Sequence, residues 1–418
     1  MSTPRVTTRR QDVAPRLGVL HVALFPRCGV WSHIKELVLW QTQRGLEPRL
    51  ALFFGRARDR AAWLAENEPA LREVERAGVG CSLHIVAGLS SAAKGLSVRF
   101  VVAPRVREAA RRLVAERGAH RLAIHCHTSF LFGYMLPFDA GVCCPTTVVT
   151  ALHGVHPASA RYDRGMRNRL YGALARRCIR YSTVVSVDQT GAANCARYFG
   201  VDPARIIVIH NGTSVPPTLS RTARDGAAPV RFGFIGRLDR RKGWDVLCDA
   251  FERGVREGAR WELILAGDGV DESSVKQRIA SLGGRARLLG HVARPAEEFY
   301  PQIDVLVLPS EGEGLPMVAL EAGARGIPII ATRVGGLPLI VLDGVTGRLV
   351  APSDVEQLTN AMRALDEPRA RAGMSREVRA HVEAHFSIDA CGSRWLQAAY
   401  GVEPDIGDSG EFRSSAFN

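Results

Sequence analysis

The stretch VLVLPSEGEGLPMVALEAGARGIPIIAT, residues 305–332, decides the fold of this protein. The apolar run 305–308 predicts a buried strand. A loop that carries glycine and glutamate follows it, and we expect a helix to begin near Pro316, because the missing N–H of proline costs nothing in the first helical turn. A second apolar run, 329–332, predicts another strand. Apolar strands joined by a helix are typical of a parallel sheet that helices cover on both faces.

The same alternation extends along most of the chain. It predicts strands at 18–24, 48–54, 82–86, 122–125, 146–151, 183–187 and 206–209 in the first half, and at 230–235, 261–266 and 287–289 in the second. Helices are expected between most of them, for example at 33–44 and 104–117. The sequence therefore predicts an α/β protein of two doubly wound, Rossmann-like domains that face a central cleft, where ligands usually bind.

The chain of 418 residues is long enough for two domains of roughly 200 residues each. We expect a disordered N-terminus (1–15), an N-terminal domain (16–215), a linker (216–229) that opens with two prolines, and a C-terminal domain (230–388). A C-terminal helix (389–401) is expected to pack back on the N-terminal domain. The last residues, 402–418, are expected to form a disordered tail, because they are rich in Gly, Ser and Asp.

Composition bears on the cellular location and on the partners. No run of about 18 apolar residues occurs, and the N-terminus lacks the apolar stretch of a secretory signal, so we expect a cytoplasmic protein. The nine cysteines include no Cys-x-x-Cys pair and are expected to be reduced. The formal net charge of +13 favours acidic partners such as nucleic acid, anionic lipid or phosphorylated substrates.

Two segments, 94–121 and 161–180, are especially rich in arginine. One interpretation is peripheral contact with an anionic membrane or with a lipid-diphosphate acceptor. The other is a solvated arginine-rich surface without a partner. In the second segment, Leu170, Leu174, Cys178 and Tyr181 would share one helical face.

The stretch FGFIGRLDRRK, residues 232–242, predicts a phosphate site. An apolar strand ends at Gly236, and a turn into a helix follows, where free backbone N–H groups and the helix dipole favour anions. Arg237 offers a planar fork of N–H donors and Lys242 a compact positive charge. Together they suit a diphosphate, whereas a lone arginine and lysine at this spacing would more often be a solvated basic loop.

The loop and helix after residue 308 supply the complementary groups. The N–H groups of Met317 and Val318 are free to meet a phosphate or a ribose. Glu313 lies in the loop, and Glu321 lies eight residues on, about two helical turns later. Carboxylates accept hydrogen bonds from hydroxyls, so the pair could hold both ends of a sugar–diphosphate–ribose unit.

These motifs resemble those of the retaining glycosyltransferases of family 4, which have the GT-B fold. The matches follow the family order over most of residues 232–352: Arg237 and Lys242, Ala266-Gly267-Asp268-Gly269, Leu289-Gly290-His291-Val292, Pro309-Ser310, Glu313 and Glu321, Gly326-x-Pro328, Gly335-Gly336, and Asp343-Gly344-x-Thr346-Gly347. One departure is Leu339, where the family often has glutamate after Gly-Gly-x-Pro.

The resemblance assigns a role to each residue of this pocket. Arg237 and Lys242 would neutralise the donor diphosphate. Glu313 would hold hydroxyls of the donor sugar, and Glu321 would hold the ribose. Backbone contacts would come from the loop residues, which are Gly314, Leu315, Met317 and Val318.

The N-terminal half carries less specific motifs. Residues 28–33 resemble the family's Gly-Gly-x-x-x-His loop with Cys28 in place of the first glycine, and Gly29 could still let the backbone approach the diphosphate. His33 is interpreted as a packing residue at the start of a helix. Residues 151–159 resemble the loop of the catalytic histidine, which makes His153 the candidate catalytic residue beside the reacting carbon.

Three further histidines receive no catalytic role. His156 is not expected to be catalytic. His125 and His127 form a His-x-His pair at another strand end, where we expect them to line the cleft. Metal binding by that pair alone is a weak prediction.

The resemblance implies transfer of a sugar from a nucleotide-diphosphate sugar to a glycan or lipid-linked acceptor in cell-surface polysaccharide biosynthesis. The anomeric configuration would be retained by front-face attack. No Asp-x-Asp occurs, so no metal and no cofactor are expected, and the cationic pair would serve the leaving diphosphate. Nucleic acid is not expected as a partner.

Other functions predict other features. A nicotinamide-dependent oxidoreductase would show Gly-x-Gly-x-x-Gly after a strand, and the sequence has none. A sugar phosphorylase would need a cofactor-lysine site, which is not identified. A non-catalytic sugar- or lipid-binding subunit on the same scaffold remains the alternative that the sequence leaves open.

Overall fold

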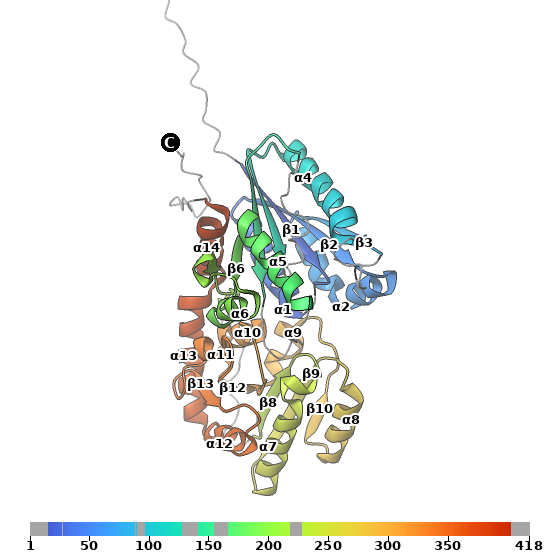
Figure 1. The fold of residues 1–418 in the computed structure, drawn as a ribbon. Coiled ribbons are helices and arrows are strands. Elements are labelled where there is room, and N and C mark those ends of the chain that lie inside the picture. Colours follow the sequence, from blue (N-terminus) through green and yellow to red (C-terminus); the bar gives the residue numbers. More distant parts are fainter. Residues whose placement is uncertain are drawn as a thin grey trace, which may run out of the picture.

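The computed structural model describes residues 16–26, 28–87, 89, 97–127, 141–153, 166–217 and 228–402. Two α/β bodies lie one above the other, the N-terminal one in blue to green and the C-terminal one in yellow to red (Figure 1). Each body is built on a parallel sheet with helices on its faces. The prediction of two doubly wound domains is therefore confirmed.

The N-terminal sheet has seven parallel strands in the order β3-β2-β1-β4-β5-β6-β7. Its strands are β1 (Leu17–Leu24), β2 (Glu47–Phe54), β3 (Gly80–Ile85), β4 (Arg121–His127), β5 (Thr146–Leu152), β6 (Thr183–Ser186) and β7 (Ile206–Val208). The helices are α1 (Cys28–Gln43), α2 (Ala57–Arg76), α4 (Ala103–Arg117), α5 (Met166–Tyr181) and α6 (Gln189–Phe199). A short π-helix, Val98–Val102, leads into α4, and a 3-10 turn, Pro203–Arg205, precedes β7.

The C-terminal sheet has six parallel strands in the order β10-β9-β8-β11-β12-β13. They are β8 (Val230–Ile235), β9 (Trp261–Ala266), β10 (Ala286–Leu288), β11 (Val305–Leu308), β12 (Ile329–Thr332) and β13 (Gly347–Val350). The helices are α7 (Trp244–Arg256), α8 (Glu272–Ser281), α9 (Pro295–Glu298), α10 (Met317–Ala324), α11 (Leu337–Ile340), α12 (Val355–Ala364) and α13 (Pro368–Phe386). Strands β8, β9, β11 and β12 are almost wholly buried, which explains their near-continuous apolar sequences.

The structure differs from the sequence predictions in three places. Residues 28–30, expected in a loop, form the first turn of α1. Pro316 caps α10 with an extended backbone instead of lying inside its first turn. Strand β13 was not predicted, because its sequence GRLV has no apolar run. These residues form a strand because they pair with β12.

The C-terminal segment packs against the N-terminal domain. Helix α14 (Ile388–Arg394) and the π-helix Trp395–Ala399 follow α13, and Trp395 and Tyr400 are buried in a core that includes residues of β1, β4 and α1. Trp40 Nε1 donates a hydrogen bond to Asp389 Oδ1 at 2.8 Å. The two crossings between the domains lie side by side, because Thr213 pairs with Ser387 as an isolated β-bridge.

No helix in the described part of the chain is long and apolar enough to span a lipid bilayer. No disulfide joins the cysteines whose side chains the structure describes.

We predict that Trp395→Ala destabilises the protein by about 3–5 kcal/mol, because it empties a fully buried site. Trp395→Phe should cost much less, since it keeps most of the packing and removes a buried Nε1–H that has no described partner. Urea unfolding followed by tryptophan fluorescence and circular dichroism measures both values. Equal losses for the two variants would contradict the packing of this segment in the core.

Candidate functional site

Each sheet has one point where the strand order reverses direction, and ligands of open α/β sheets bind outside the carboxyl ends of the strands at such a point. In the C-terminal sheet the point lies between β8 and β11, which pair directly at Val305–Phe232 and Leu306–Gly233. Arg237 and Lys242 follow β8, and Glu313 follows β11. The topology therefore brings the two sequence motifs to one edge.

Lys242 and Glu313 form an ion pair at this edge. Lys242 Nζ lies 2.7 Å from Glu313 Oε1, and Ser310 Oγ donates to the same oxygen at 2.7 Å. The side chains are 24% and 10% exposed, so the pair is partly shielded from water. An ammonium carries three N–H donors, and this contact uses one of them. The remaining donors of Lys242 can still serve the oxygens of a diphosphate.

Arg237 lies on the segment after β8 that also carries Lys242, and its side chain is more exposed. Its Nε lies 2.6 Å from Asp239 Oδ2, and its side chain is 53% exposed. Arg241 approaches the other oxygen of Asp239 at 3.7 Å. Asp239 thus restrains the guanidinium of Arg237 through Nε and leaves its terminal amino groups available for an anion.

Glycines let the loops of this site approach each other closely. Gly335 has a φ of +54°, and a Cβ there would lie 1.9 Å from the carbonyl oxygen of Glu313. The N–H of Gly336 donates to the carbonyl oxygen of Gly314 at 2.7 Å. The Gly-Gly pair noted in the sequence therefore supports the backbone that carries Glu313, and no larger residue fits at Gly335.

The N-terminal end of helix α10 faces the N-terminal domain. The N–H groups of Met317 and Val318 begin the helix, so they have no helical carbonyl to bond and can meet an anion. A Cβ on Gly29 would lie 3.8 Å from Met317 Cγ, which places the start of α1 against the start of α10. The structure thus brings Gly29 close to Met317, one of the residues predicted for the donor site.

Asn211 is a site residue that the sequence analysis did not assign. Its side chain is buried, and Nδ2 donates to the carbonyl oxygen of Leu315 at 2.8 Å. This bond ties the end of the N-terminal domain to the loop that carries Glu313. A hydrogen bond between residues 104 positions apart leaves no local signal in the sequence.

Glu321 lies on α10 and is half-buried. Tyr300 Oη donates to Glu321 Oε2 at 2.7 Å, and Arg325 covers the Tyr300 ring with its guanidinium carbon 5.2 Å from the ring centroid. Burial raises the pKa of Glu321, and its bond from Tyr300 opposes that shift. Tyr300 is a second residue that sequence reasoning missed, since it comes from the 3-10 turn Tyr300–Gln302 before β11.

His153 follows β5 in the N-terminal domain, and its Nε2 lies 3.1 Å from Nδ1 of His127 at the end of β4. Its ring also lies 4.9 Å from the ring of His33, centroid to centroid. His33 is buried within α1, as expected for a packing residue. His125 and His127 are 0% and 2% exposed, so the expectation that they line the cleft is wrong. His156 lies outside the described residues.

The arginine-rich segments are described in part. In α4 the side chains of Arg105, Arg111 and Arg112 are exposed, and Arg112 pairs with Glu108 at 2.8 Å. In α5, Leu174 and Cys178 are buried as expected. Tyr181 is 39% exposed and does not share their buried face, because it ends the helix. Residues 91–96 and 161–165 lie outside the described part.

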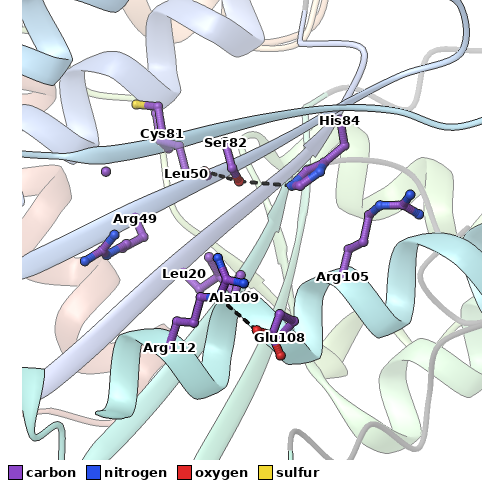
Figure 2. A pocket seen from close by; sticks show the side chains of 11 residues that line it. Leu20, Arg49, Leu50, Cys81, Ser82, His84, Arg105, Glu108, Ala109 and Arg112 are labelled. Atoms are coloured by element: carbon purple, nitrogen blue, oxygen red, sulfur yellow. Dashed lines mark hydrogen bonds and ion pairs between the residues drawn. The ribbon is translucent and has the colours of Figure 1, made fainter. Parts of the chain in front are cut away.

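A cavity of about 330 Å³ lies between α4 and the edge of the N-terminal sheet formed by β1, β2 and β3. Figure 2 shows Arg49, His84, Arg105 and Arg112 around it. Arg49 and Arg112 are already paired with Glu116 and Glu108. None of the residues predicted for the donor site lines this cavity, and we assign it no ligand.

The fold and the site define a class of protein: two Rossmann-like domains with a cationic and carboxylate pocket at the switch point of the second sheet. Residues 229–367 match the family described as glycosyl transferases group 1, and residues 28–215 match glycosyltransferase family 4. The chain belongs to this glycosyltransferase family.

The chain is also similar to individual proteins. It is 33% identical over 197 residues to a glycogen synthase from Mycobacterium tuberculosis, covering 45% of this chain and 46% of that one. It is 32% identical over 203 residues to a D-inositol 3-phosphate glycosyltransferase from Thermobifida fusca, covering 44% and 47%. The chain thus spans about half the length of the curated relatives it matches. Anabaena HepE, solved in complex with UDP and glucose, matches with a TM-score of 0.69 at 17% identity, covering 92% of this chain and all of that one. At this identity the likeness to HepE concerns the fold.

Burial of the histidines predicts a loss of stability in acid. Burial lowers the pKa of His21 to about 4, below its ordinary 6.5. Between pH 6.5 and 4 the unfolded chain therefore binds a proton on His21 that the folded protein does not bind. Between these two values the free energy of unfolding should fall by up to about 1.4 kcal/mol per pH unit for this imidazole.

Urea unfolding at pH 7.5, 6 and 5 measures this slope, and His21→Asn is the matched comparison. In the variant, unfolding should take up about one proton fewer between these pH values. Its free energy of unfolding should therefore fall less steeply as the pH is lowered. Identical slopes for the two proteins would show that His21 titrates normally in the folded state.

Proposed function

We propose that the protein is a glycosyltransferase that takes a sugar from a nucleotide-diphosphate sugar. The observation that carries the proposal is the Lys242–Glu313 pair at the switch point of the second sheet. The pair sets an anion-binding cation against a hydroxyl-binding carboxylate, which are the two needs of a sugar linked to a diphosphate. That a solved structural neighbour holds UDP and glucose supports the same reading of the pocket.

Each donor-site residue then has a task. Lys242 and Arg237 take up the negative charge that develops on the leaving diphosphate. Glu313 accepts hydrogen bonds from hydroxyls of the donor sugar, and Glu321 from those of the ribose. Gly314, Leu315, Met317 and Val318 offer backbone groups, and Gly29 lets the facing domain come close to the diphosphate. His153 lies in the opposite domain as the catalytic residue beside the reacting carbon.

The finer features of the reaction rest on the family resemblance. We infer that the anomeric configuration is retained and that the departing phosphate takes the proton of the acceptor hydroxyl. No metal and no cofactor are required, because the cationic pair does the work of a metal on the diphosphate. The acceptor is a glycan or a lipid-linked glycan of a cell-surface polysaccharide pathway. The exposed arginines of α4 favour an acceptor at an anionic membrane surface in the cytoplasm.

A panel of UDP-, GDP- and ADP-sugars tests the proposal by release of nucleoside diphosphate. Glu313→Ala should lower kcat by about a hundredfold, because a charged hydrogen bond to the reacting sugar is lost. Glu311→Ala is the matched control, since this exposed glutamate lies on the same loop. Proton NMR of the product reads the anomeric configuration, and retention is expected.

The outcomes separate the enzyme from the non-catalytic alternative. Donor binding without any transfer or hydrolysis would support a binding subunit on the same scaffold. Neither binding nor turnover of any donor in the panel would overturn the proposed function.

Tyr300→Phe tests the ribose site. The variant removes the 2.7 Å bond to Glu321 and leaves the carboxylate without its orienting donor. KM for the donor should rise about fivefold, the equivalent of about 1 kcal/mol, with kcat nearly unchanged. Steady-state kinetics with the preferred donor measure both constants, and a fall in kcat at constant KM would contradict the assignment of Glu321 to the ribose.

A further inference from the structure

Five histidines gather at the switch point of the N-terminal sheet, between β1 and β4. His21 lies on β1, His33 on α1, His125 and His127 on β4, and His153 directly after β5. All except His153 are nearly inaccessible to solvent. Stacked and tilted contacts join the rings, with centroids 3.9 Å apart for His125 and His127 and 5.4 Å for His127 and His153.

Hydrogen bonds order three of these rings into one chain that ends at an amide. His153 Nε2 lies 3.1 Å from His127 Nδ1, and His127 Nε2 lies 2.9 Å from His21 Nδ1. His21 Nε2 lies 2.8 Å from Gln41 Oε1. The chain thus runs from the candidate catalytic residue through the core of the domain to Gln41 on α1.

Gln41 in turn reaches the C-terminal segment of the protein. Its Nε2 donates to Tyr400 Oη at 3.3 Å, and Tyr400 Oη lies 2.8 Å from His125 Nδ1. The amide nitrogen therefore faces Tyr400, and the amide oxygen faces His21. His125 bonds only to Tyr400 and is not part of the series of hydrogen bonds that joins Gln41 to His153.

The amide oxygen fixes the proton on every ring of the chain. An amide oxygen only accepts, so His21 Nε2 carries the hydrogen. A neutral imidazole has one N–H, which leaves His21 Nδ1 as an acceptor for His127 Nε2–H. His127 Nδ1 is then bare and accepts from His153 Nε2–H. By the same count, His153 keeps an unprotonated Nδ1.

Neutral rings are what this environment favours. Burial is the main cause that lowers the pKa of His21 and of His153 to about 4. Burial likewise lowers the pKa of His127 well below its ordinary value, and the neighbouring imidazoles add to that shift. At neutral pH each ring therefore has one donor and one acceptor, as the chain requires.

We propose that Gln41 is a positioning residue that, through His21 and His127, holds His153 in the tautomer with a bare Nδ1. The proposal rests on the proposed function of His153, and it assigns Nδ1 as the acceptor of a hydrogen bond from a substrate hydroxyl. In this tautomer Nδ1 accepts a hydrogen bond from the hydroxyl and cannot donate one to it. Among the hydrogen-bonded residues from His153 to Gln41, only His153 needs to touch the substrate.

The opposite polarity is the direct alternative. If the amide of Gln41 were turned over, its nitrogen would donate to His21, and each bond of the chain would reverse. His153 would then carry the hydrogen on Nδ1 and would offer a donor to the substrate. Tyr400 Oη can donate as well as accept, so it bonds either end of the amide, and the tautomer of His153 decides between the two arrangements.

A transition metal is a different occupant of the same cluster. Ring nitrogens of His33, His127 and His153 lie within 4.8 Å of one another, and both nitrogens of His33 are buried without a described partner. Imidazole nitrogens suit Zn²⁺ or Cu²⁺. The hydrogen bonds from His153 to His127 and from His127 to His21 explain the approach of His127 and His153 without an ion, and a metal on His127 would break the hydrogen-bonded chain.

Nitrogen NMR of the whole protein tests the proposal directly. With ¹⁵N-histidine, long-range proton–nitrogen correlations distinguish the two neutral tautomers, and loss of a signal in His153→Gln assigns it. We expect His153 to show a protonated Nε2 and an unprotonated Nδ1. The reverse tautomer would overturn the proposal, and so would one equivalent of tightly bound metal in the purified protein by elemental analysis.

Kinetics test the role of Gln41 at a distance. Gln41→Leu removes the terminal acceptor, so His153 should show mixed tautomers and kcat should fall roughly tenfold, with KM for the donor within about twofold. Trp395→Phe is the matched control, because this ring packs 4.4 Å from His125 in the same core and breaks no link. Its kcat and tautomers should be unchanged.

Two results would overturn the proposal: an unchanged His153 tautomer in Gln41→Leu, or an unchanged kcat despite altered tautomers. Failure of the proposed function is distinguishable. In that case wild-type protein transfers no sugar from any donor, whereas the tautomer of His153 is read without turnover.

Discussion

The proposed donor pocket depends on one ion pair, in which Lys242 and Glu313 meet across the loops that follow two neighbouring strands. Opposite charges that are partly shielded from water stabilise each other only while both are present, and losing either leaves a charge with little solvation. The pair therefore holds two loops of different origin in one geometry before any ligand arrives. Such preorganisation is what an electrostatic site needs, since it spends no free energy on reordering during the reaction.

The backbone around the pair is arranged so that this geometry is possible. Gly335 and Gly336 pass directly beneath the loop of Glu313, and Asn211 holds the carbonyl of Leu315 from the other domain. Thr213, which pairs with Ser387 where the chain passes between the domains, lies two residues after Asn211. Contacts between the domains thus end in the same loop that carries Glu313, which links the position of the domains to the shape of the candidate pocket.

Much of this architecture could be predicted from the sequence, because buried parallel strands leave continuous apolar runs. The strands 230–235, 261–266, 305–308 and 329–332 were placed at their observed bounds. The fold class and the family were also predicted, since the glycines and charges of 232–347 keep a specific spacing. Strand β13 was missed because its pairing with β12, and not its own residues, makes it a strand.

Contacts between residues far apart in sequence were beyond prediction. Tyr300 and Asn211 join the site only through the fold, and nothing near them in the chain marks a partner. The histidines were visible as residues, but their burial was not, so His125 and His127 were expected in the cleft. Their chain of bonds requires β1, β4 and α1 to be placed together first.

The two domains use their switch points in different ways. The C-terminal one gathers charges that suit the diphosphate and the sugar hydroxyls. The N-terminal one gathers neutral imidazoles, with His153 at the edge and the rest in the core. Between the two switch points, the start of α1 at Gly29 lies close to the start of α10 at Met317. A charged half and a neutral, hydrogen-bonding half facing each other suit a reaction in which the diphosphate departs from one side while a hydroxyl is guided from the other.

Binding of nucleoside diphosphates in the absence of metal tests the central claim most directly. Calorimetric titration of UDP, GDP and ADP in buffer with EDTA should show binding of at least one of them. Lys242→Met should weaken that binding by about tenfold or more, whereas Lys276→Met, which removes an exposed lysine paired with Glu272 on α8, should leave it unchanged. Binding that needs added Mg²⁺, or binding that Lys242→Met leaves intact, would contradict the account.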